Sequence, residues 1–151
     1  ILVYRSQPLD SPLDIAGAPT ANLFVSTTAA DTDIFVRLVD EHPHDAEGSG
    51  AALEICYGML RLRHRNGLDQ DEPVPPGQIV EVMVDLGPTA CRFEVGHRIR
   101  VEVTSSDFPN HDRNHNTGGN DLAEATLVAA TTSIFHGSQH PARIQLPMMP
   151  A

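Results

Sequence analysis

Hydrophobic and polar positions alternate in short stretches along this chain of 151 residues. The clearest stretch is 97–109, where Ile99, Val101 and Val103 alternate with charged side chains. A period of two is typical of a β-strand with one buried and one solvated face. By this pattern, and by enrichment in β-branched and aromatic residues, we predict strands within 1–4, 21–28, 32–43, 57–66, 79–88, 97–109, 123–137 and 139–150. Residues 123–130 could also form a helical turn.

Proline and glycine interrupt the chain too often for long helices. The 12 Pro and 11 Gly bracket the predicted strands, and no long stretch has a helical period. Residues 44–52 form a flexible polar connection of the hairpin type, and residues 66–78 form an acidic, Pro-rich loop. About eight strands with such connections predict an all-β protein: a jelly-roll β-sandwich of two antiparallel sheets, like the galactose-binding domains. No internal repeat or linker is visible, so residues 1–151 are predicted to form one domain.

Arginine recurs at every second position within 57–66. Arg61, Arg63 and Arg65 would lie on one face of the predicted strand, opposite a face that carries Leu62. The simplest interpretation is a solvated sheet face. The alternative is a face that docks against an acidic partner surface.

Charge and composition narrow the function classes. The net charge is −10 and all ten cationic side chains are Arg. Phosphate binding needs clustered cations, so we predict no nucleic-acid partner. No run of eighteen apolar residues and no signal peptide is visible, so no membrane span is predicted. The chain begins at Ile1 inside a strand-like stretch, and we expect it to be part of a longer protein.

The motifs do not favour nucleophilic catalysis. A serine nucleophile of the α/β-hydrolase type needs Gly-x-Ser-x-Gly at a strand-to-helix turn. Ser49 instead has Gly on both immediate sides, within a polar loop. Cys56 and Cys91 have no helix N-terminus or evident base beside them to generate a thiolate. We interpret them as buried thiols, with a single disulfide as the alternative.

The densest run of polar side chains, DFPNHDRNHNTGGND at 107–121, is the main candidate for a site. Three of its residues stand at the first, third and fifth positions of an EF-hand-like calcium series: Asp112, Asn114 and Asn116. That series needs Gly at position six and Glu at position twelve, where this chain has Thr117 and Ala123. The calcium frame therefore fails, and an irregular site that uses Asp107 or Asp121 is the remaining calcium alternative.

A structural interpretation fits the same run better. Asp and Asn side chains hydrogen-bond to the backbone two residues on, and Asn tolerates left-handed conformations. Gly118 and Gly119 add two permissive positions, and Arg113 has several carboxylates nearby for a bidentate pair. We therefore predict a rigid, self-capped loop that faces another domain. The candidate structural or interface residues are Asp107, Asp112, Arg113, Asn114 and Asn116, together with Arg61, Arg63 and Arg65.

Metal and sugar sites are weaker hypotheses. Three His pairs have close spacing: His42 with His44, His111 with His115, and His136 with His140. Imidazoles four residues apart converge on one ion when they lie on a helix, whereas these pairs involve loops. We therefore predict no zinc site and no cofactor. Sugar-binding faces use aromatic platforms, and the chain has no Trp and two Tyr. A free-standing carbohydrate-binding or calcium-stabilised module remains the rival function.

The order of motifs resembles a known family. The most specific segments are VRLVDEHP, GMLRLRHR, GHRIRVEVTSSDFP and DRNHNTG. They are similar to the C-terminal non-catalytic domain of the cocaine-esterase and X-prolyl dipeptidyl-peptidase group of serine hydrolases. The resemblance covers nearly the whole chain. The chain departs from the family at His111 and His115, where aromatic or apolar residues are common in the family.

The resemblance implies an accessory role. Members of this group carry an α/β-hydrolase domain with a helical cap, followed by a jelly-roll domain that packs against both. The Ser-His-Asp triad lies in the hydrolase part, and none of it maps onto this chain. The parent would cleave acyl esters, amides or Xaa-Pro dipeptides. Its N-terminal hydrolase and cap domains would be the partners, and the isolated chain is expected to self-associate through the surface that they cover.

Overall fold

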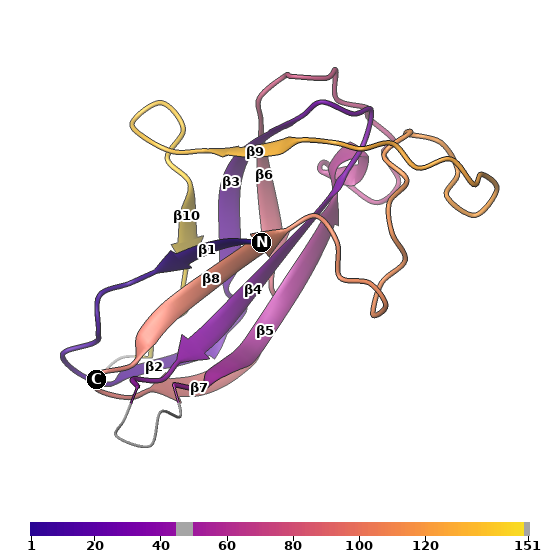
Figure 1. Ribbon diagram of the computed structural model, residues 1–151. Coiled ribbons are helices and arrows are strands. Elements are labelled where there is room, and N and C mark those ends of the chain that lie inside the picture. The colour runs from indigo at the N-terminus through magenta and orange to yellow at the C-terminus, as the bar shows by residue number, and fades with distance from the viewer. Residues whose placement is uncertain (45–49, 150–151) are drawn as a thin grey trace.

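The computed structural model describes residues 1–44 and 50–149 of the chain. These residues form ten β-strands and one 3-10 helix (Figure 1). In chain order the elements are β1 (Leu2–Arg5), β2 (Leu13–Gly17), β3 (Thr20–Thr27), β4 (Asp33–Glu41), β5 (Ala52–Arg61), η1 (Leu62–His64), β6 (Val80–Asp85), β7 (Thr89–Phe93), β8 (Arg98–Thr104), β9 (Thr132–Phe135) and β10 (Arg143–Gln145). Within the described ranges, no helix is long and apolar enough to cross a membrane.

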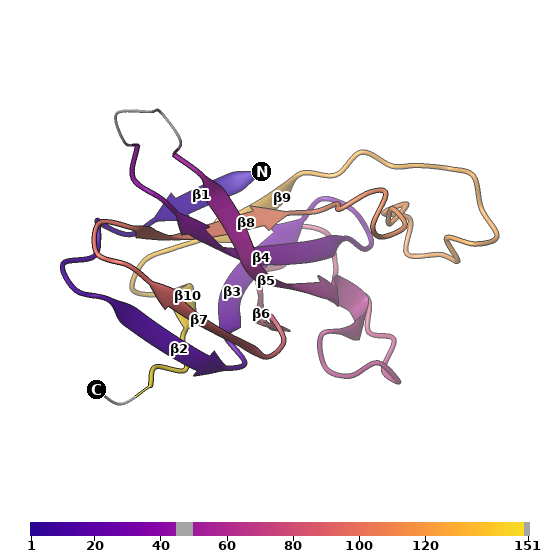
Figure 2. The same cartoon turned by 90° about the horizontal axis from the view of Figure 1, so that it is seen from below.

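The strands form three antiparallel sheets. The first has the order β1-β8-β4-β5, the second β10-β3-β6 with β9 also paired to β3, and the third is the pair β2-β7. Strand β3 is central in the second sheet, since β6 pairs with one of its edges while β9 and β10 follow one another along the other. Figures 1 and 2 show the two larger sheets facing each other, with β2 and β7 at one end. The predicted all-β sandwich is confirmed, with ten strands rather than eight.

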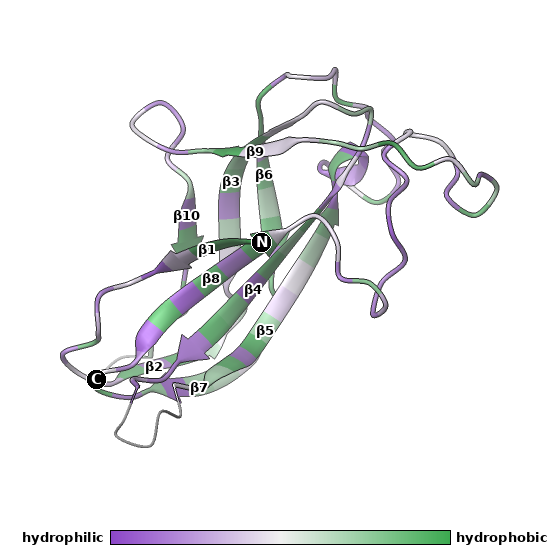
Figure 3. Cartoon of the chain, in the orientation of Figure 1, coloured by the Kyte–Doolittle hydropathy of each residue, from purple (hydrophilic) through white to green (hydrophobic). Residues whose placement is uncertain are grey.

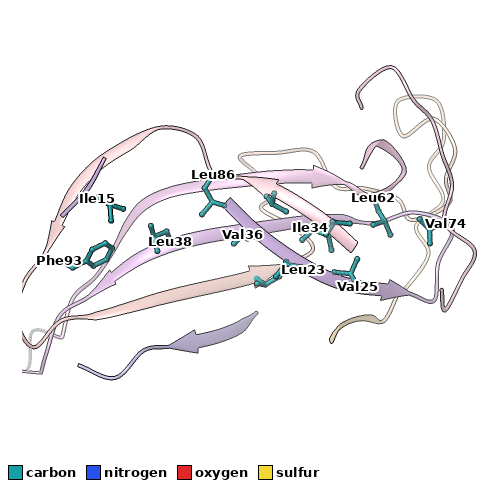
Figure 4. Close-up of a cluster of buried hydrophobic side chains, with 14 residues drawn as sticks. Ile15, Leu23, Val25, Ile34, Val36, Leu38, Leu62, Val74, Leu86 and Phe93 are labelled. Atoms are coloured by element: carbon teal, nitrogen blue, oxygen red, sulfur yellow. The ribbon is translucent and has the colours of Figure 1, made fainter. Parts of the chain in front are cut away.

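The core lies between the two larger sheets and extends to the small one. Alternate residues of β3 point into it, and Ala21, Leu23 and Val25 are buried while their neighbours are partly exposed. Figure 4 shows the buried side chains running from Phe93 near the small sheet to Leu62 at the opposite end. The alternation that predicts these strands therefore marks the face that each one buries.

Strand β4 is buried on both faces. Ile34, Val36 and Leu38 belong to the core between the sheets. Phe35 and Val39 point outward, yet they are only 1% and 4% exposed. Figure 3 shows the difference: β4 is hydrophobic along most of its length, whereas β8 beside it alternates. Another part of the chain must therefore cover the outer face of β4.

The predicted strand 57–66 is wrong beyond Arg61. Strand β5 begins earlier, at Ala52, and the chain turns into η1 after Arg61. The Leu62 amide donates to the carbonyl oxygen of Thr32 at 2.9 Å, and the Arg63 amide donates to Asp31 Oδ1 at 3.1 Å. The first bond continues the register in which Arg61 lies opposite Asp33, whereas the second goes to a side chain, so the backbone ladder and the apparent alternation end after Leu62.

Two other predicted strands are much shorter than expected. Only Thr132–Phe135 of the stretch 123–137 is a strand, and only Arg143–Gln145 of 139–150. Strand β2 lies in a segment that the sequence pattern did not mark. Residues 45–49, which belong to the predicted flexible connection, lie outside the described residues.

Candidate domain-interface loop

The polar loop (residues 105–131), which joins β8 to β9, covers the part of the outer face of β4 that carries Phe35 and Arg37. Figures 1 and 2 show it extending beyond the sheets at the end where β4 begins. The His111 ring lies 5.2 Å from the Phe35 ring, measured between centroids, on the outer face of β4. At the start of the loop, Asp107 forms an ion pair with Arg37 of the same strand. The loop therefore buries a phenyl ring that a simple strand would expose.

Two buried carboxylates anchor the loop. Asp31 and Asp33, at the start of β4, are each 1% exposed, and Asn114 of the loop is 8% exposed. The Asn114 amide nitrogen Nδ2 donates to Asp31 Oδ2 at 2.9 Å and to Asp33 Oδ1 at 2.9 Å. A buried carboxylate needs hydrogen bonds or a counter-charge to offset the loss of water. One loop side chain supplies such bonds to both carboxylates.

Arg61, the last residue of β5, supplies a counter-charge. Its Nε and Nη2 donate to the two carboxylate oxygens of Asp33 at 2.9 Å and 3.1 Å, which is a bidentate pair. Its Nη1 lies 2.9 Å from Asp121 Oδ2 of the loop. The hydrogen bonds that it donates to Asp33 raise the pKa of the Arg61 guanidinium, with further contributions from Asp121 and Asp31. Arg61 thus links β4, β5 and the loop.

Arg63, in η1, forms a longer, single ion-pair contact with Asp31. Its Nε lies 3.4 Å from Asp31 Oδ2. Its Nη1 donates to the carbonyl oxygens of Gly118 and Gly119 at 2.9 Å and 3.0 Å. The 3-10 turn after β5 carries this side chain, which thereby contacts both Asp31 and the loop.

The loop also contains the local hydrogen bonds that its sequence predicts. The Asn116 amide donates to Asn114 Oδ1 at 2.8 Å, and the Leu122 amide donates to Asn120 Oδ1 at 3.0 Å. Asn116 has a φ of 62° and Gly118 a φ of 74°, both in the left-handed region. The loop is therefore held by its own side chains as well as by Arg61 and Arg63.

Some predicted site residues lie elsewhere. Arg65 is separate from this cluster and pairs with Glu72, with 3.2 Å between Nη2 and Oε2. Asp112 and Arg113 are exposed. The carboxylate pair expected for Arg113 is wrong for the described part of the chain, and its guanidinium instead lies 5.5 Å from the centroid of the Phe108 ring. Two loop carboxylates, Asp107 and Asp121, pair instead with Arg37 and Arg61 of the strands.

The sequence interpretation missed Asp31, Asp33 and Arg37. All three are polar residues inside or next to a strongly apolar strand, and a charged residue in such a strand is the signal that could have found them. The solvated Arg face is also a wrong interpretation for Arg61 and Arg63, whose side chains are 22% and 13% exposed.

The outward side of the polar loop carries large apolar side chains. Leu122 is 90% exposed and Phe108 is 64% exposed. Beside them, Tyr57 and Met59 of β5 are partly exposed, and a surface cleft lies between Met59, His111 and Leu122. We call Tyr57, Met59, Phe108 and Leu122 the apolar rim. Exposed apolar side chains on a well-anchored polar support are typical of a binding surface.

The arrangement offers little for catalysis. Asp33 and Asp121 pair with Arg61, and Asp107 pairs with Arg37, so guanidinium groups offset the charge of these carboxylates. Ser49 lies outside the described residues.

The two cysteines have the properties of unreactive thiols. Both are free and half-buried, so the disulfide alternative is wrong. Burial raises the pKa of Cys56 to about 11, with smaller contributions from Cys91 and Glu54. Burial also raises the pKa of Cys91. Since the thiolate is the nucleophile, neither thiol is poised for catalysis.

Comparison with known proteins decides the family. Residues 1–145 match the family described as the X-Pro dipeptidyl-peptidase C-terminal non-catalytic domain. The chain belongs to this family. The match runs from β1 through β10, so it includes the polar loop and the strands that anchor it.

Relatives and solved structures agree with this assignment. The chain is 39% identical over 151 residues to the cocaine esterase of Rhodococcus sp. (strain MB1 Bresler). This match covers 99% of this chain and 25% of the esterase. An α-amino acid ester hydrolase structure matches with a TM-score of 0.91 and 32% identity, over 98% of this chain and 25% of that one. An aminopeptidase from a marine sediment Thaumarchaeota archaeon matches with a TM-score of 0.89 and 31% identity, over 99% and 26%. The chain therefore spans about a quarter of the length of the curated relatives it matches.

Proposed function

We propose that this chain is the C-terminal accessory domain of a serine hydrolase and that it packs against the catalytic part of the same protein. The observation that carries the proposal is the family match over residues 1–145, in relatives whose chains are about four times as long. The named relatives include an esterase, an ester hydrolase and an aminopeptidase. The parent would accordingly cleave acyl esters, amides or Xaa-Pro dipeptides.

The polar loop is the surface through which the domain would meet its catalytic partner. Interfaces between domains of one chain typically cover about 600–1,500 Å². The apolar rim exposes hydrophobic side chains to water, and Leu122, at 90% exposure, is the most exposed of its four members. The buried pairs of Arg61 and Arg63 would hold this surface in one conformation, which lowers the entropic cost of docking. Arg65 would lie outside the interface, where its pair with Glu72 would hold the neighbouring 66–72 turn.

The first experiment separates an accessory domain from an enzyme. Residues 1–151, purified to homogeneity, are incubated with an aryl ester and with an Xaa-Pro arylamide. The expected result is no turnover above the buffer rate, because the catalytic triad belongs to the missing part. Ester or amide turnover that co-purifies with the chain would overturn the proposal.

The second experiment locates the interface. The upstream part of the parent is expressed without residues 1–151, and binding of the separate chain is measured by titration. Leu122→Asp should weaken binding by at least tenfold, since it places a charge in the apolar interface. Leu68→Asp is the matched control: Leu68 is 92% exposed but lies in the turn after η1. Equal effects of the two variants would exclude the polar loop as the contact.

The same surface makes the isolated chain prone to self-association. Without a catalytic partner the apolar rim faces water, and we expect concentration-dependent dimers in sedimentation velocity experiments. Leu122→Asp should shift the distribution to monomer and Leu68→Asp should not. A monomer at all concentrations would count against an apolar interface here.

A further inference from the structure

A second polar cluster lies at the other end of β4 from the polar loop. Asp40 is next to last in β4, His42 follows the strand, and His97 immediately precedes β8. Strands β4 and β8 are paired neighbours, with Asp40 opposite Ile99 and Glu41 opposite Arg98. This register places the end of β4 beside the residue before β8, so two histidines from distant parts of the sequence meet at one carboxylate.

The three side chains converge through specific atoms. His97 Nδ1 lies 2.9 Å from Asp40 Oδ1 and 3.1 Å from Oδ2. His42 Nε2 lies 3.4 Å from Asp40 Oδ2. One nitrogen of each imidazole and one carboxylate oxygen all lie within 4.8 Å of one another. The two imidazole rings lie beside each other, with 4.2 Å between their centroids.

This spacing suits a tetrahedral metal ion. Zinc binds imidazole nitrogen and carboxylate oxygen at about 2.0–2.2 Å, so two ligand atoms of a tetrahedral site lie about 3.3–3.5 Å apart. Two imidazoles on such an ion have their centroids about 5 Å apart, so the rings of His42 and His97, now 4.2 Å apart, would separate by about 1 Å on binding. Two imidazoles with a single carboxylate favour zinc over calcium or magnesium, which prefer oxygen ligands.

The surroundings allow an ion to enter and a fourth ligand to bind. The Asp40 side chain is 9% exposed and that of His97 is 15% exposed, whereas that of His42 is 32% exposed. His42 opens onto a surface cleft that His44 also lines. Arg98 lines this cleft too, but its guanidinium donates to the Ser6 carbonyl oxygen at 2.7 Å. The Asp40 carboxylate is therefore left to the two imidazoles.

We propose that Asp40, His42 and His97 form a zinc site that ties the end of β4 to the residue before β8. In the metal-free chain both facing nitrogens can donate to Asp40. Zinc binding requires their lone pairs, so each neutral imidazole keeps its proton on the other ring nitrogen instead. Water or His44 takes the fourth position. This site is remote from the polar loop and does not depend on the proposed interface.

The spacing of histidines in the sequence could not have found this site. It suggests His42 with His44, two residues apart, whereas the convergent partner of His42 is His97. Strand pairing between β4 and β8 supplies the partner, and that pairing is visible only in the fold.

The test uses the 151-residue chain, freed of metal with a chelator and titrated with Zn²⁺ by calorimetry. One ion per chain should bind, and the midpoint of thermal unfolding should rise and return on chelation, because the folded state alone presents the site. Loss of outer-shell partners costs about 10–100-fold in metal affinity. His42→Gln and His97→Gln, which remove direct ligands, should therefore each lower the affinity by at least about 100-fold.

A matched control keeps the test specific. His136→Gln replaces an exposed histidine that hydrogen-bonds to Tyr4, and it should leave the affinity unchanged. His42 is a third exposed and follows its strand, so its replacement should preserve the far-ultraviolet circular dichroism. Unchanged zinc affinity in His42→Gln or in His97→Gln would overturn the proposal, as would equally tight binding of Ca²⁺ or Mg²⁺.

Discussion

Replacement of Asn114 by alanine tests whether the polar loop is anchored by its buried amide. The variant removes two hydrogen bonds of 2.9 Å, to Asp31 and to Asp33, and leaves both buried carboxylates short of a donor. It also removes the weaker, neutral hydrogen bond that Asn114 Oδ1 accepts from the Asn116 amide. Hydrogen bonds to charged groups contribute about 1.5–3 kcal/mol each, so the expected loss of unfolding free energy is about 3–6 kcal/mol. Since domains of this size have a stability of about 5–15 kcal/mol, the loss would be a large fraction of the total.

Chemical denaturation of the 151-residue chain measures this loss directly. In thermal unfolding, the same change should lower the midpoint by roughly 6–24 °C, at about 2–4 °C per kcal/mol for a chain of this length. Asn120→Ala is the matched control, because Asn120 is an exposed loop residue that accepts one backbone hydrogen bond, from Leu122. It should cost at most about 1 kcal/mol. If Asn114→Ala costs no more than Asn120→Ala, the buried amide does not anchor the loop.

Three further experiments test other parts of the fold. Gly58→Ala should cost at least about 3 kcal/mol in chemical denaturation, or prevent folding, because its Cβ would lie 2.0 Å from the backbone oxygen of Asp85; a variant of normal stability would contradict this packing. Cys56, with its pKa raised to about 11, should react slowly with iodoacetamide at neutral pH and rapidly after denaturation, and equal rates would refute its burial. The hydrogen bond from Arg5 lowers the pKa of the Glu41 carboxyl, so this pair stabilises the chain above the ordinary pKa of Glu and ceases to do so as pH falls through the lowered value. Glu41→Gln should therefore be less stable than the parent chain at neutral pH, with a difference that narrows below about pH 4; a difference that does not depend on pH would contradict this.

Local sequence patterns predict those strands whose conformation depends mainly on pairing within one sheet and on burial of one face. The alternation in 97–109 and the apolar run in 32–43 correspond to β8 and β4, and their buried faces match the pattern. The pattern fails at Arg63, whose backbone amide bonds to Asp31 in a distant part of the sequence. It also fails at 123–131, where strand-forming residues find no partner strand. Propensity marks residues that can form a strand, but pairing decides which of them do.

The candidate site also has one part that the sequence predicts and another that it does not. Local capping in the polar loop is predictable, since Asn116 and Gly118 adopt the left-handed conformations that their residue types allow. The ion pairs are not predictable, because Asp107 and Asp121 pair with arginines of β4 and β5 rather than with Arg113 beside them in the sequence. Which charges meet depends on strand register, and single-sequence patterns do not determine register.

The double burial of β4 has a consequence for the substitutions that the chain can accept. In β3, every second side chain is partly exposed, so a library of random variants should recover polar replacements at alternate positions. In β4, Phe35 and Val39 are as enclosed as Val36 and Leu38, and only Arg37 and Glu41 are partly exposed. Surviving variants should therefore show a two-residue rhythm along β3 and almost none along β4. Sequence change at Phe35 or Arg37 would have to be matched by change in the polar loop, which contacts both.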